Sequence, residues 1–210
     1  MRLTKYGHAC VRVEHDGGVL VIDPGMFTEP AALDGVDAVL ITHEHADHLD
    51  VGALADALAR RPSVTVHTNA AVASKLDALA GVVTTVDSGD TFTAAGMPVR
   101  AYGGLHADIH PEIPRVPNLG FVVNDRVYHP GDSFDVPDDV TVDTLFVPVS
   151  APWLKLSEAV EFVRAVAPRR AYALHDALLS DAGQQVTAGV LSRLAGCEYA
   201  RLEPGTVLPE

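Results

Sequence analysis

A histidine-rich segment contains the residues best suited to chemistry. Residues 43–48 read His-Glu-His-Ala-Asp-His, so four side chains able to bind a metal ion fall within six positions: His43, His45, Asp47 and His48. Imidazole nitrogens suit zinc, while a carboxylate adds charge and accepts harder ions such as manganese or iron. Any one of these histidines alone is better explained as a solvated residue at a turn. Their joint spacing, H-x-H-x-D-H, predicts a metal site.

The elements on either side of this segment are predicted to aim it. Ala38–Ile41 is apolar throughout, which is typical of a strand buried on both faces. Alternate side chains of an extended chain project to the same side, so His43 and His45 can approach one ion together. Asp47 and His48 lie where the chain turns into a helix expected over Val51–Arg60, and this turn can direct them at a second ion nearby.

Four local residues cannot complete two coordination spheres, so the metal hypothesis requires ligands elsewhere in the chain. His106, Asp132 and His175 each follow or end a predicted strand. Strand ends share a rigid platform, and side chains placed there can converge from distant parts of a sequence. His110 lies four residues after His106, and spacing alone leaves either histidine as the ligand.

The rest of the chain alternates strand-like and helix-like stretches. Its 210 residues, 48% of them hydrophobic, fit one domain over 1–210. Asp16-Gly17-Gly18 between two apolar runs predicts a hairpin, and Glu203 begins a tail expected to be a loop or an edge strand. Helices are expected over 51–60, 70–80, 157–167 (capped by Ser157) and 183–194. This order predicts an α/β fold in which two packed sheets carry helices outside.

The ordered set of H-x-H-x-D-H, a later histidine, an aspartate in Gly131-Asp132 and a final histidine after a strand resembles the metallo-β-lactamase superfamily. The likeness spans residues 7–176. It implies a four-layer αβ/βα sandwich, in which two mixed sheets carry helices on both outer faces and metals bind at one sheet edge. Three short runs further resemble a small bacterial branch that includes ascorbate-6-phosphate lactonase: Gly7-His8-Ala9, Ile22-Asp23-Pro24 and Tyr128-His129-Pro130-Gly131-Asp132.

The resemblance also implies a ligand set and a reaction. It places His43, His45 and His106 on a first divalent metal ion and Asp47, His48 and His175 on a second, with Asp132 bridging both. Zinc is the expected metal, with manganese or iron as alternatives. Two such ions generate hydroxide near neutral pH, which implies hydrolysis of an ester, lactone or phosphoester in a small molecule. Asp47 is then expected to orient the attacking water as well.

Five further residues are expected around the site. His8 could contact the substrate or the metals, or be a hydrogen-bonded core histidine. Asp23 could accept the second N–H of a ligand histidine, or simply form a turn before Pro24. His110 lies in a Pro-rich stretch, 105–117, expected to be a loop over the cleft. Trp153 and Lys155 are expected to wall the pocket and could bind an anionic group, although a tryptophan is most often simply packed.

Charge and composition limit the partners. With 15 basic and 28 acidic residues, the net charge of −13 disfavours nucleic acid and anionic membranes, whereas bound cations would still admit an anionic small substrate. The first residues lack a secretory signal and no long apolar run follows, so a cytoplasmic location is expected. Cys10 and Cys197 are expected to be reduced thiols. A homo-oligomer is compatible with the sequence, which does not determine the oligomeric state.

Three alternatives to small-molecule hydrolysis stay open. The first is a phosphodiesterase or nuclease on the same fold, which the acidic composition disfavours. The second is redox chemistry on two iron ions, which is disfavoured because the chain is too short to include a flavin domain. The third is a non-catalytic metal-binding protein. The presence of all seven proposed ligands predicts metal binding, but it does not by itself establish turnover.

Overall fold

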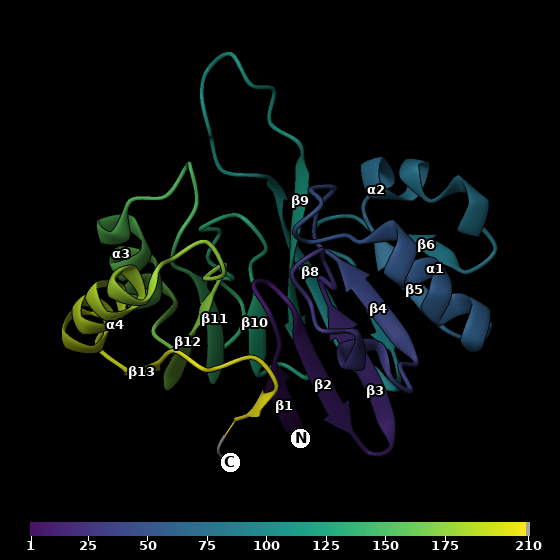
Figure 1. The fold of residues 1–210 in the computed structure, drawn as a ribbon, viewed down its shortest axis with the longest axis horizontal. Helices are drawn as coiled ribbons and strands as arrows, with labels where there is room; N and C mark the ends of the chain where they lie inside the picture. The colour runs from purple at the N-terminus through teal and green to yellow at the C-terminus, as the bar shows by residue number, and fades with distance from the viewer. Residues whose placement is uncertain (209–210) are drawn as a thin grey trace.

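Two β-sheets packed face to face form the centre of the computed structural model, which describes residues 1–208 (Figure 1). Residues 209–210 of the expected domain lie outside the described part. The first sheet runs in the order β14 (Thr206–Val207), β1 (Arg2–Lys5), β2 (Val11–His15), β3 (Gly18–Ile22), β4 (Ala38–Ile41), β5 (Thr65–Thr68) and β6 (Val83–Thr85). The second runs in the order β13 (Glu198–Ala200), β12 (Arg170–Leu174), β11 (Thr144–Pro148), β10 (Val127–His129), β9 (Pro117–Val123), β8 (Met97–Leu105) and β7 (Thr91–Ala94).

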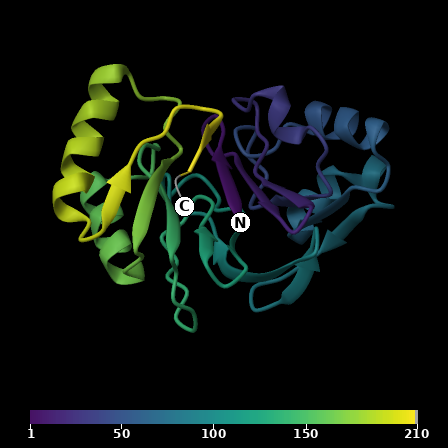
Figure 2. The same cartoon turned by 90° about the horizontal axis from the view of Figure 1, so that it is seen from below.

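Helices cover the outer face of each sheet. On the first sheet lie η1 (Pro30–Leu33), α1 (Val51–Arg60), α2 (Ala70–Lys75) and η2 (Asp77–Leu79), and on the second lie α3 (Leu156–Val166) and α4 (Asp181–Leu194). Seen from below, the two helical layers flank the paired sheets on opposite sides (Figure 2). The expected αβ/βα sandwich is thereby confirmed.

The β4 strand shows why the layers hold together. Ala38 and Leu40 point into the core between the two sheets, while Val39 and Ile41 pack under the helices of the first sheet. Side chains of a strand alternate between its faces, so an apolar run with no polar position must be buried on both. All four residues are fully buried, as the sequence predicts.

Parallel strands bring the ends of β4, β10 and β12 to one edge of the molecule. Strands β3 to β6 pair in parallel, as do β10 to β13. The carboxyl ends of such strands point the same way, so the segments that follow them lie at the same edge. Figure 1 shows this edge at the top, with loop 106–116 rising above it, and both termini at the opposite edge.

Several element boundaries differ from the sequence-based prediction. The helix predicted over 70–80 is interrupted, because Leu76 leaves helical geometry (φ −106°, ψ 23°) and a short 3-10 turn follows. The prediction of Ser157 as a cap is wrong: α3 begins one residue earlier, and Lys155 occupies the cap position without a side-chain hydrogen bond. Helix α4 begins at Asp181 rather than 183, because the Ser180 side chain accepts a hydrogen bond from Gly183 N.

Two strands near the termini pair with each other. The β1 strand, which the sequence did not predict, pairs with β2 on one side and with β14 on the other. The tail after Glu203 therefore supplies an edge strand, one of the two outcomes expected for it. The predicted hairpin at Asp16 and Gly17 is confirmed, and both residues have the positive φ that a tight turn requires (49° and 85°).

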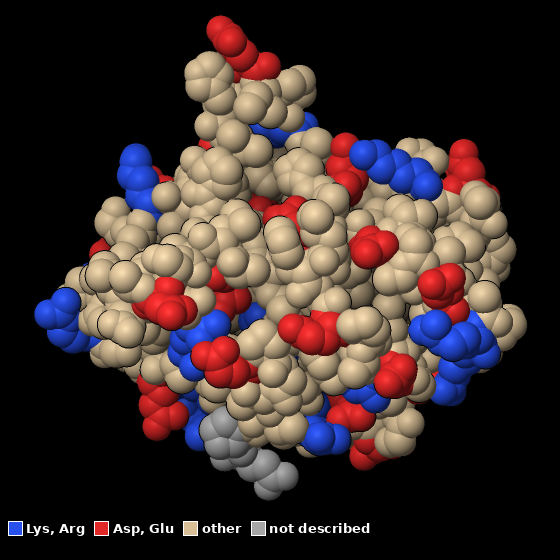
Figure 3. All heavy atoms as spheres, in the orientation of Figure 1, with Lys and Arg blue, Asp and Glu red and all other residues tan. Residues whose placement is uncertain are grey.

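The surface shows no single dominant charged patch on the visible face. Asp and Glu side chains are spread over it, with Lys and Arg between them (Figure 3). Within residues 1–208, no helix is both long and apolar enough to cross a membrane. Both cysteines are free: Cys10 is buried and Cys197 is half-buried.

Candidate metal centre

The histidine-rich segment forms a tight loop between β4 and α1. The segment of residues 23–27 packs beside this loop and holds it in place, since Met26 N donates a hydrogen bond to Ala46 O at 2.9 Å. Gly25 lies so close to the loop that an added Cβ would be 1.9 Å from the Asp47 carbonyl oxygen. Only glycine allows this approach, so the conformation of the loop depends on a residue outside the motif.

Three imidazoles form the first group of candidate ligands: His43, His45 and His106. Nε2 of His43 lies 3.0 Å from Nδ1 of His45. The ring centroid of His106 lies 5.0 Å from that of His43 and 4.8 Å from that of His45. Nδ1 of His106 contacts Ala107 O at 2.6 Å, which leaves its Nε2 on the side of the cluster. One nitrogen from each ring lies within 4.8 Å of the others.

His110 lies outside this group. It is exposed in loop 106–116, where its Nδ1 accepts a hydrogen bond from Glu112 N at 3.2 Å. His106 is buried at the end of β8. The structure therefore brings His106 to the other imidazoles and keeps His110 apart, an alternative that spacing alone left open.

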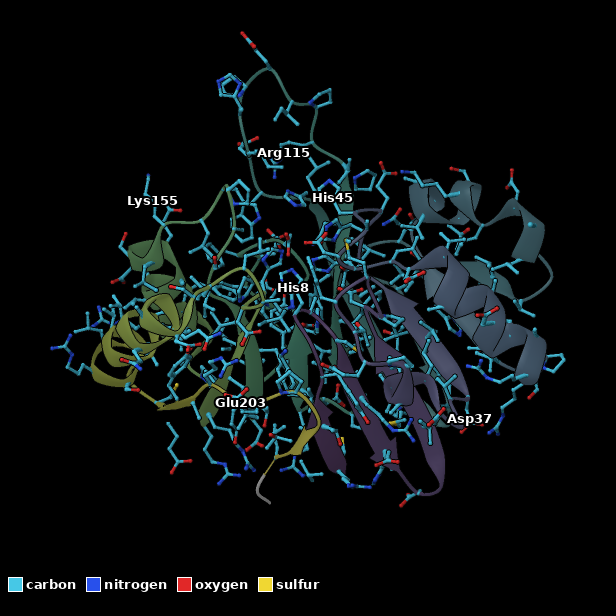
Figure 4. All side chains as sticks on the ribbon, viewed as in Figure 1. His8, Asp37, His45, Arg115, Lys155 and Glu203 are labelled. Carbon is cyan, nitrogen blue, oxygen red and sulfur yellow. The ribbon has the colours of Figure 1, made fainter. Side chains whose placement is uncertain are left out.

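The second group consists of Asp47, His48 and His175, joined by His8. Nε2 of His175 lies 3.2 Å from Asp47 Oδ2, and Nε2 of His8 lies 3.0 Å from the same oxygen. The rings of His48 and His175 have centroids 5.4 Å apart. One ligand atom from each of these four residues lies within 4.8 Å of the others. Figure 4 shows His8 and His45 beneath the loop that carries Arg115.

Asp132 lies between the two groups. Its Oδ1 lies 3.1 Å from Nε2 of His48, and its Oδ2 lies 3.3 Å from Nε2 of His106 and 3.2 Å from Nε2 of His175. The backbone N–H of Asp132 donates to Asn118 Oδ1 at 3.0 Å, which anchors the loop that carries it. Its carboxylate thus contacts imidazoles of both groups.

The cluster fits the binding of metal ions. Among the described residues, three of its buried atoms have no hydrogen-bond partner: His48 Nε2, Asp132 Oδ1 and His175 Nε2. Although these atoms lie 3.1 to 3.2 Å from polar atoms of neighbouring side chains, none of them forms a hydrogen bond. Buried polar atoms without hydrogen bonds are costly, and atoms that face a common point are arranged as ligands. Six imidazoles, that of His8 included, and two carboxylates form a donor set that suits metal ions such as zinc.

Asp23 holds the orientation of His48. Its fully buried carboxylate lies 2.6 Å from His48 Nδ1 and accepts hydrogen bonds from Thr42 N at 2.8 Å and Thr42 Oγ1 at 2.7 Å. An ionised carboxylate can only accept, so the neutral His48 ring must carry its proton on Nδ1. The lone pair of Nε2 then faces the cluster, as in metal sites where a carboxylate orients a ligand histidine.

Three supporting residues were not singled out by the sequence. Thr42 Oγ1 lies 3.0 Å from His43 Nδ1, and its position next to the motif could have marked it. Asn118 contacts both ends of the turn before Asp132 through its amide. The carbonyl oxygen of Ser150 lies 2.5 Å from His175 Nδ1. Neither Asn118 nor Ser150 carries a local signal, because their contacts are made across the fold.

Opposite charges within the cluster stabilise one another. Burial alone would raise the pKa of Asp132, but the His48 and His175 imidazoles hold it well below its usual range. Burial would lower the pKa of His48, but the carboxylates of Asp132 and Asp23 raise it well above its usual value. Burial lowers the pKa of His43 strongly, so this ring is neutral. Asp132 and Asp47 likewise raise the pKa of His175 to about 9, so a cation bound at Nε2 of His48 and His175 would displace one proton from each ring.

A cavity of about 570 Å³ opens beside the cluster, between loop 106–116 and the start of α3. Trp153 forms its inner wall, and the indole N–H donates to Asp132 Oδ2 at 3.2 Å. Lys155 lies on the outer rim, 78% exposed and paired with Glu158. Figure 4 shows Lys155 at the start of α3 and Arg115 at the base of the loop. His110, expected near the substrate entrance, does not line this cavity.

The family model described as a beta-lactamase superfamily domain matches residues 2–175. The chain belongs to the metallo-β-lactamase superfamily. Protein Rv0786c of Mycobacterium tuberculosis is 38% identical over 216 residues, which cover 100% of this chain and 97% of that protein. The UPF0173 metal-dependent hydrolase MJ1163 of Methanocaldococcus jannaschii is 31% identical over 153 residues, covering 70% of this chain and 67% of its own.

The fold of the chain is similar to that of CmlA, a diiron β-hydroxylase from Streptomyces venezuelae. Its crystal structure matches with a TM-score of 0.79 at 21% identity, covering 100% of this chain and 54% of that chain. At this identity the likeness concerns the fold alone. The superfamily predicted from the motifs is confirmed, while the closer likeness to ascorbate-6-phosphate lactonase stays a prediction.

Proposed function

We propose that this metal-dependent hydrolase cleaves an ester, lactone or phosphoester bond of a small molecule, with water activated at a two-metal centre. The hydrolase class rests on the family match and on the metal-dependent hydrolases among the relatives. The finer proposal is supported above all by the convergence of seven side chains from separate parts of the chain, three of which have buried atoms without hydrogen-bond partners.

The residues divide into two ligand sets that share one carboxylate. His43, His45 and His106 would hold one ion, and Asp47, His48 and His175 the other, with Asp132 contacting both. Two bound divalent ions would lower the pKa of water toward neutrality and stabilise the negative charge that develops on the substrate. We propose zinc as the metal, because imidazole dominates the donor set.

Asp47 is the residue we assign to the orientation of the attacking water. Its side chain is 24% exposed, against 4% for Asp132 and none for His48, so it is the carboxylate that solvent reaches. His8 keeps it in place: His8 Nδ1 accepts from Ala177 N at 3.3 Å, so the ring proton lies on Nε2 and is donated to Asp47 Oδ2. His8 therefore acts by positioning Asp47.

The cavity beside the cluster is the proposed substrate site. Trp153 and Phe134 offer apolar contact at its inner end. Two cations and three carboxylates line it: Arg115, Lys155, Asp108, Asp135 and Glu158. The wall itself therefore has no excess of positive charge. Attraction of an anionic substrate would come from the metal ions, with Lys155 as a secondary contact.

Metal content and a substrate panel test this function together. Elemental analysis of protein purified without added metal should find two metal ions per chain. Lactones, thioesters, phosphomonoesters and phosphodiesters form the panel. For whichever substrate responds, His43→Ala and Asp132→Ala should abolish turnover, and unchanged turnover in either variant would contradict the proposal.

A matched pair of variants in one loop sharpens this test. His106→Ala should lower both metal content and activity, whereas His110→Ala removes an exposed histidine only four residues away and should leave metal content unchanged. Equal effects of the two variants would contradict the ligand assignment.

Iron in the protein together with oxygen consumption would instead support the redox alternative. Salt-sensitive binding of oligonucleotides would support the nuclease alternative.

A further inference from the structure

A buried lysine lies at the end of β1, three residues before His8. The Lys5 side chain is 2% exposed, and its Nζ lies 3.6 Å from Oδ1 of Asp176, whose side chain is 6% exposed. The same Nζ donates a hydrogen bond to the carbonyl oxygen of Tyr6. Burial lowers the pKa of Lys5, and the Asp176 carboxylate opposes this shift. Because a buried charge is costly unless it is paired, the contact with Asp176 is what permits a lysine at this position.

The Lys5–Asp176 pair joins the two sheets at the metal edge. Lys5 ends β1 of the first sheet, whereas Asp176 directly follows His175, the residue after β12 of the second sheet. The carboxylate of Asp176 is held from its other side as well, since Oδ2 accepts from Arg201 Nε at 2.9 Å. The pair therefore ties the segment that leads into His8 to the segment that leads out of His175.

The two histidines next to this pair have strained backbones. The φ angles of His8 and His175 are 55° and 59°, in the left-handed region that residues other than glycine rarely adopt. They support each other, since His175 N donates to His8 O at 3.1 Å and Ala177 N donates to His8 Nδ1 at 3.3 Å. Both rings place Nε2 near Asp47 Oδ2, at 3.0 Å for His8 and 3.2 Å for His175. A small movement between the two segments would change both distances.

We propose that the buried pair of Lys5 and Asp176 positions His8 and His175 against Asp47 and thereby sets the affinity of the second metal ion. This inference rests on the proposed two-metal function. Hydrophobic contact is non-directional, whereas a buried ion pair fixes one register between the elements that carry it. Among the described contacts, Lys5 and Asp176 touch none of the first group of ligands, His43, His45 and His106. Both are therefore positioning residues for one of the two ions.

Zinc titration of the metal-free full chain against a chelating dye tests this role. In Lys5→Met, which keeps a long side chain but loses the charge, the second ion should bind about tenfold more weakly and the first should be unchanged. His175→Ala removes a proposed ligand of the second ion and identifies which of the two affinities belongs to it. Arg2→Met is the matched control. It removes a cation of the same strand that pairs with Glu14 at the surface, so both affinities should equal those of the wild type.

A double variant separates positioning from general stability. Lys5→Met/Asp176→Asn removes both charges of the pair, so its unfolding free energy should return toward the wild-type value. The affinity of the second ion should stay low, because the tie between the sheets is still absent. Recovery of stability and zinc affinity together would overturn the proposal, as would wild-type zinc affinity in Lys5→Met. If Lys5→Met does not fold, the double variant is compared with the wild type in the same titration.

The stoichiometry of the wild type distinguishes this proposal from the function on which it rests. Fewer than two zinc ions per wild-type chain would contradict the two-metal function, and with it the second ion that the pair is proposed to serve. Two ions in the wild type, with equal losses at both sites in Lys5→Met, would contradict the positioning role alone and leave the two-metal function intact.

Discussion

Replacing Asp23 with asparagine should weaken one metal site without unfolding the chain. Asparagine keeps the size of the side chain and one carbonyl oxygen, which can still accept from Thr42 N. The other carboxylate oxygen becomes an NH2 group facing His48 Nδ1, 2.6 Å away. Two donors cannot share that contact, so the proton of His48 moves to Nε2. This is the atom that faces Asp132 at 3.1 Å and that we propose as the ligand.

The expected loss of metal affinity can be estimated from other metal sites in which a carboxylate orients a ligand histidine. Loss of the group that orients a ligand histidine lowers metal affinity by roughly 10- to 100-fold, or about 1.4 to 2.7 kcal/mol. The imidazoles of His43, His45 and His106 make no direct contact with Asp23 among the described hydrogen bonds. Asp23 reaches His43 only through the Thr42 hydroxyl, which lies 3.0 Å from His43 Nδ1, so their ion should lose less affinity than the ion held by His48.

Zinc titration followed by tryptophan fluorescence measures both affinities, because Trp153 is the single tryptophan and its N–H contacts Asp132. Asp37→Asn is the matched control, since Asp37 accepts from Val19 N and pairs with Arg61 away from the cluster. If Asp23→Asn leaves both zinc affinities unchanged, or weakens both sites equally, the proposed link between Asp23 and the His48 tautomer is wrong.

Three further predictions concern packing, titration and the cavity wall. Gly25→Ala places a Cβ 1.9 Å from the Asp47 carbonyl oxygen, so we expect a loss of about 1 to 3 kcal/mol in unfolding free energy together with loss of metal. In the control variant Gly81→Ala the added Cβ meets no neighbour, so stability and metal content should both be unchanged. Equal denaturation curves for the two variants would contradict the prediction. Burial raises the pKa of Cys10 from 9.0 to about 12, so its contribution to stability is complete below pH 9.0 and lost as the pH rises to about 12. The slope is up to about 1.4 kcal/mol per pH unit, and Cys10→Ala should flatten it in denaturant titrations; parallel profiles would refute this. Trp153→Phe removes the hydrogen bond to Asp132 and should lower zinc affinity about tenfold by calorimetry while the fold is kept; wild-type affinity would exclude a positioning role.

Local spacing was sufficient to predict part of the candidate site. His43, His45, Asp47 and His48 fall within six residues after an apolar strand, and both features are written in the sequence. The hairpin at Gly17 and the helix Val51–Arg60 were predictable for the same reason, since turn residues and apolar periodicity act over a few positions. The boundary at Leu76 was not, because packing in the fold decides where a marginal helix ends.

Only the tertiary structure decides whether His106 or His110 joins the other candidate ligands. Pairing of β8 with β9 and the bond from His106 N to Val116 O at 2.9 Å close the base of the loop. His106 is therefore fixed at the sheet edge, while His110 is carried out into solvent. Three loop residues separate them, and no local preference distinguishes two histidines in such a stretch.

By itself, the sequence determined which residue types are available as ligands and which of them are neighbours along the chain. Only the tertiary structure decided that His106, Asp132 and His175 meet the histidine-rich loop, and that Asn118 and Ser150 support them. The physical reason is that their convergence requires two sheets to pack so that strands from both end at one edge. That arrangement depends on burial of the whole core rather than on any single segment.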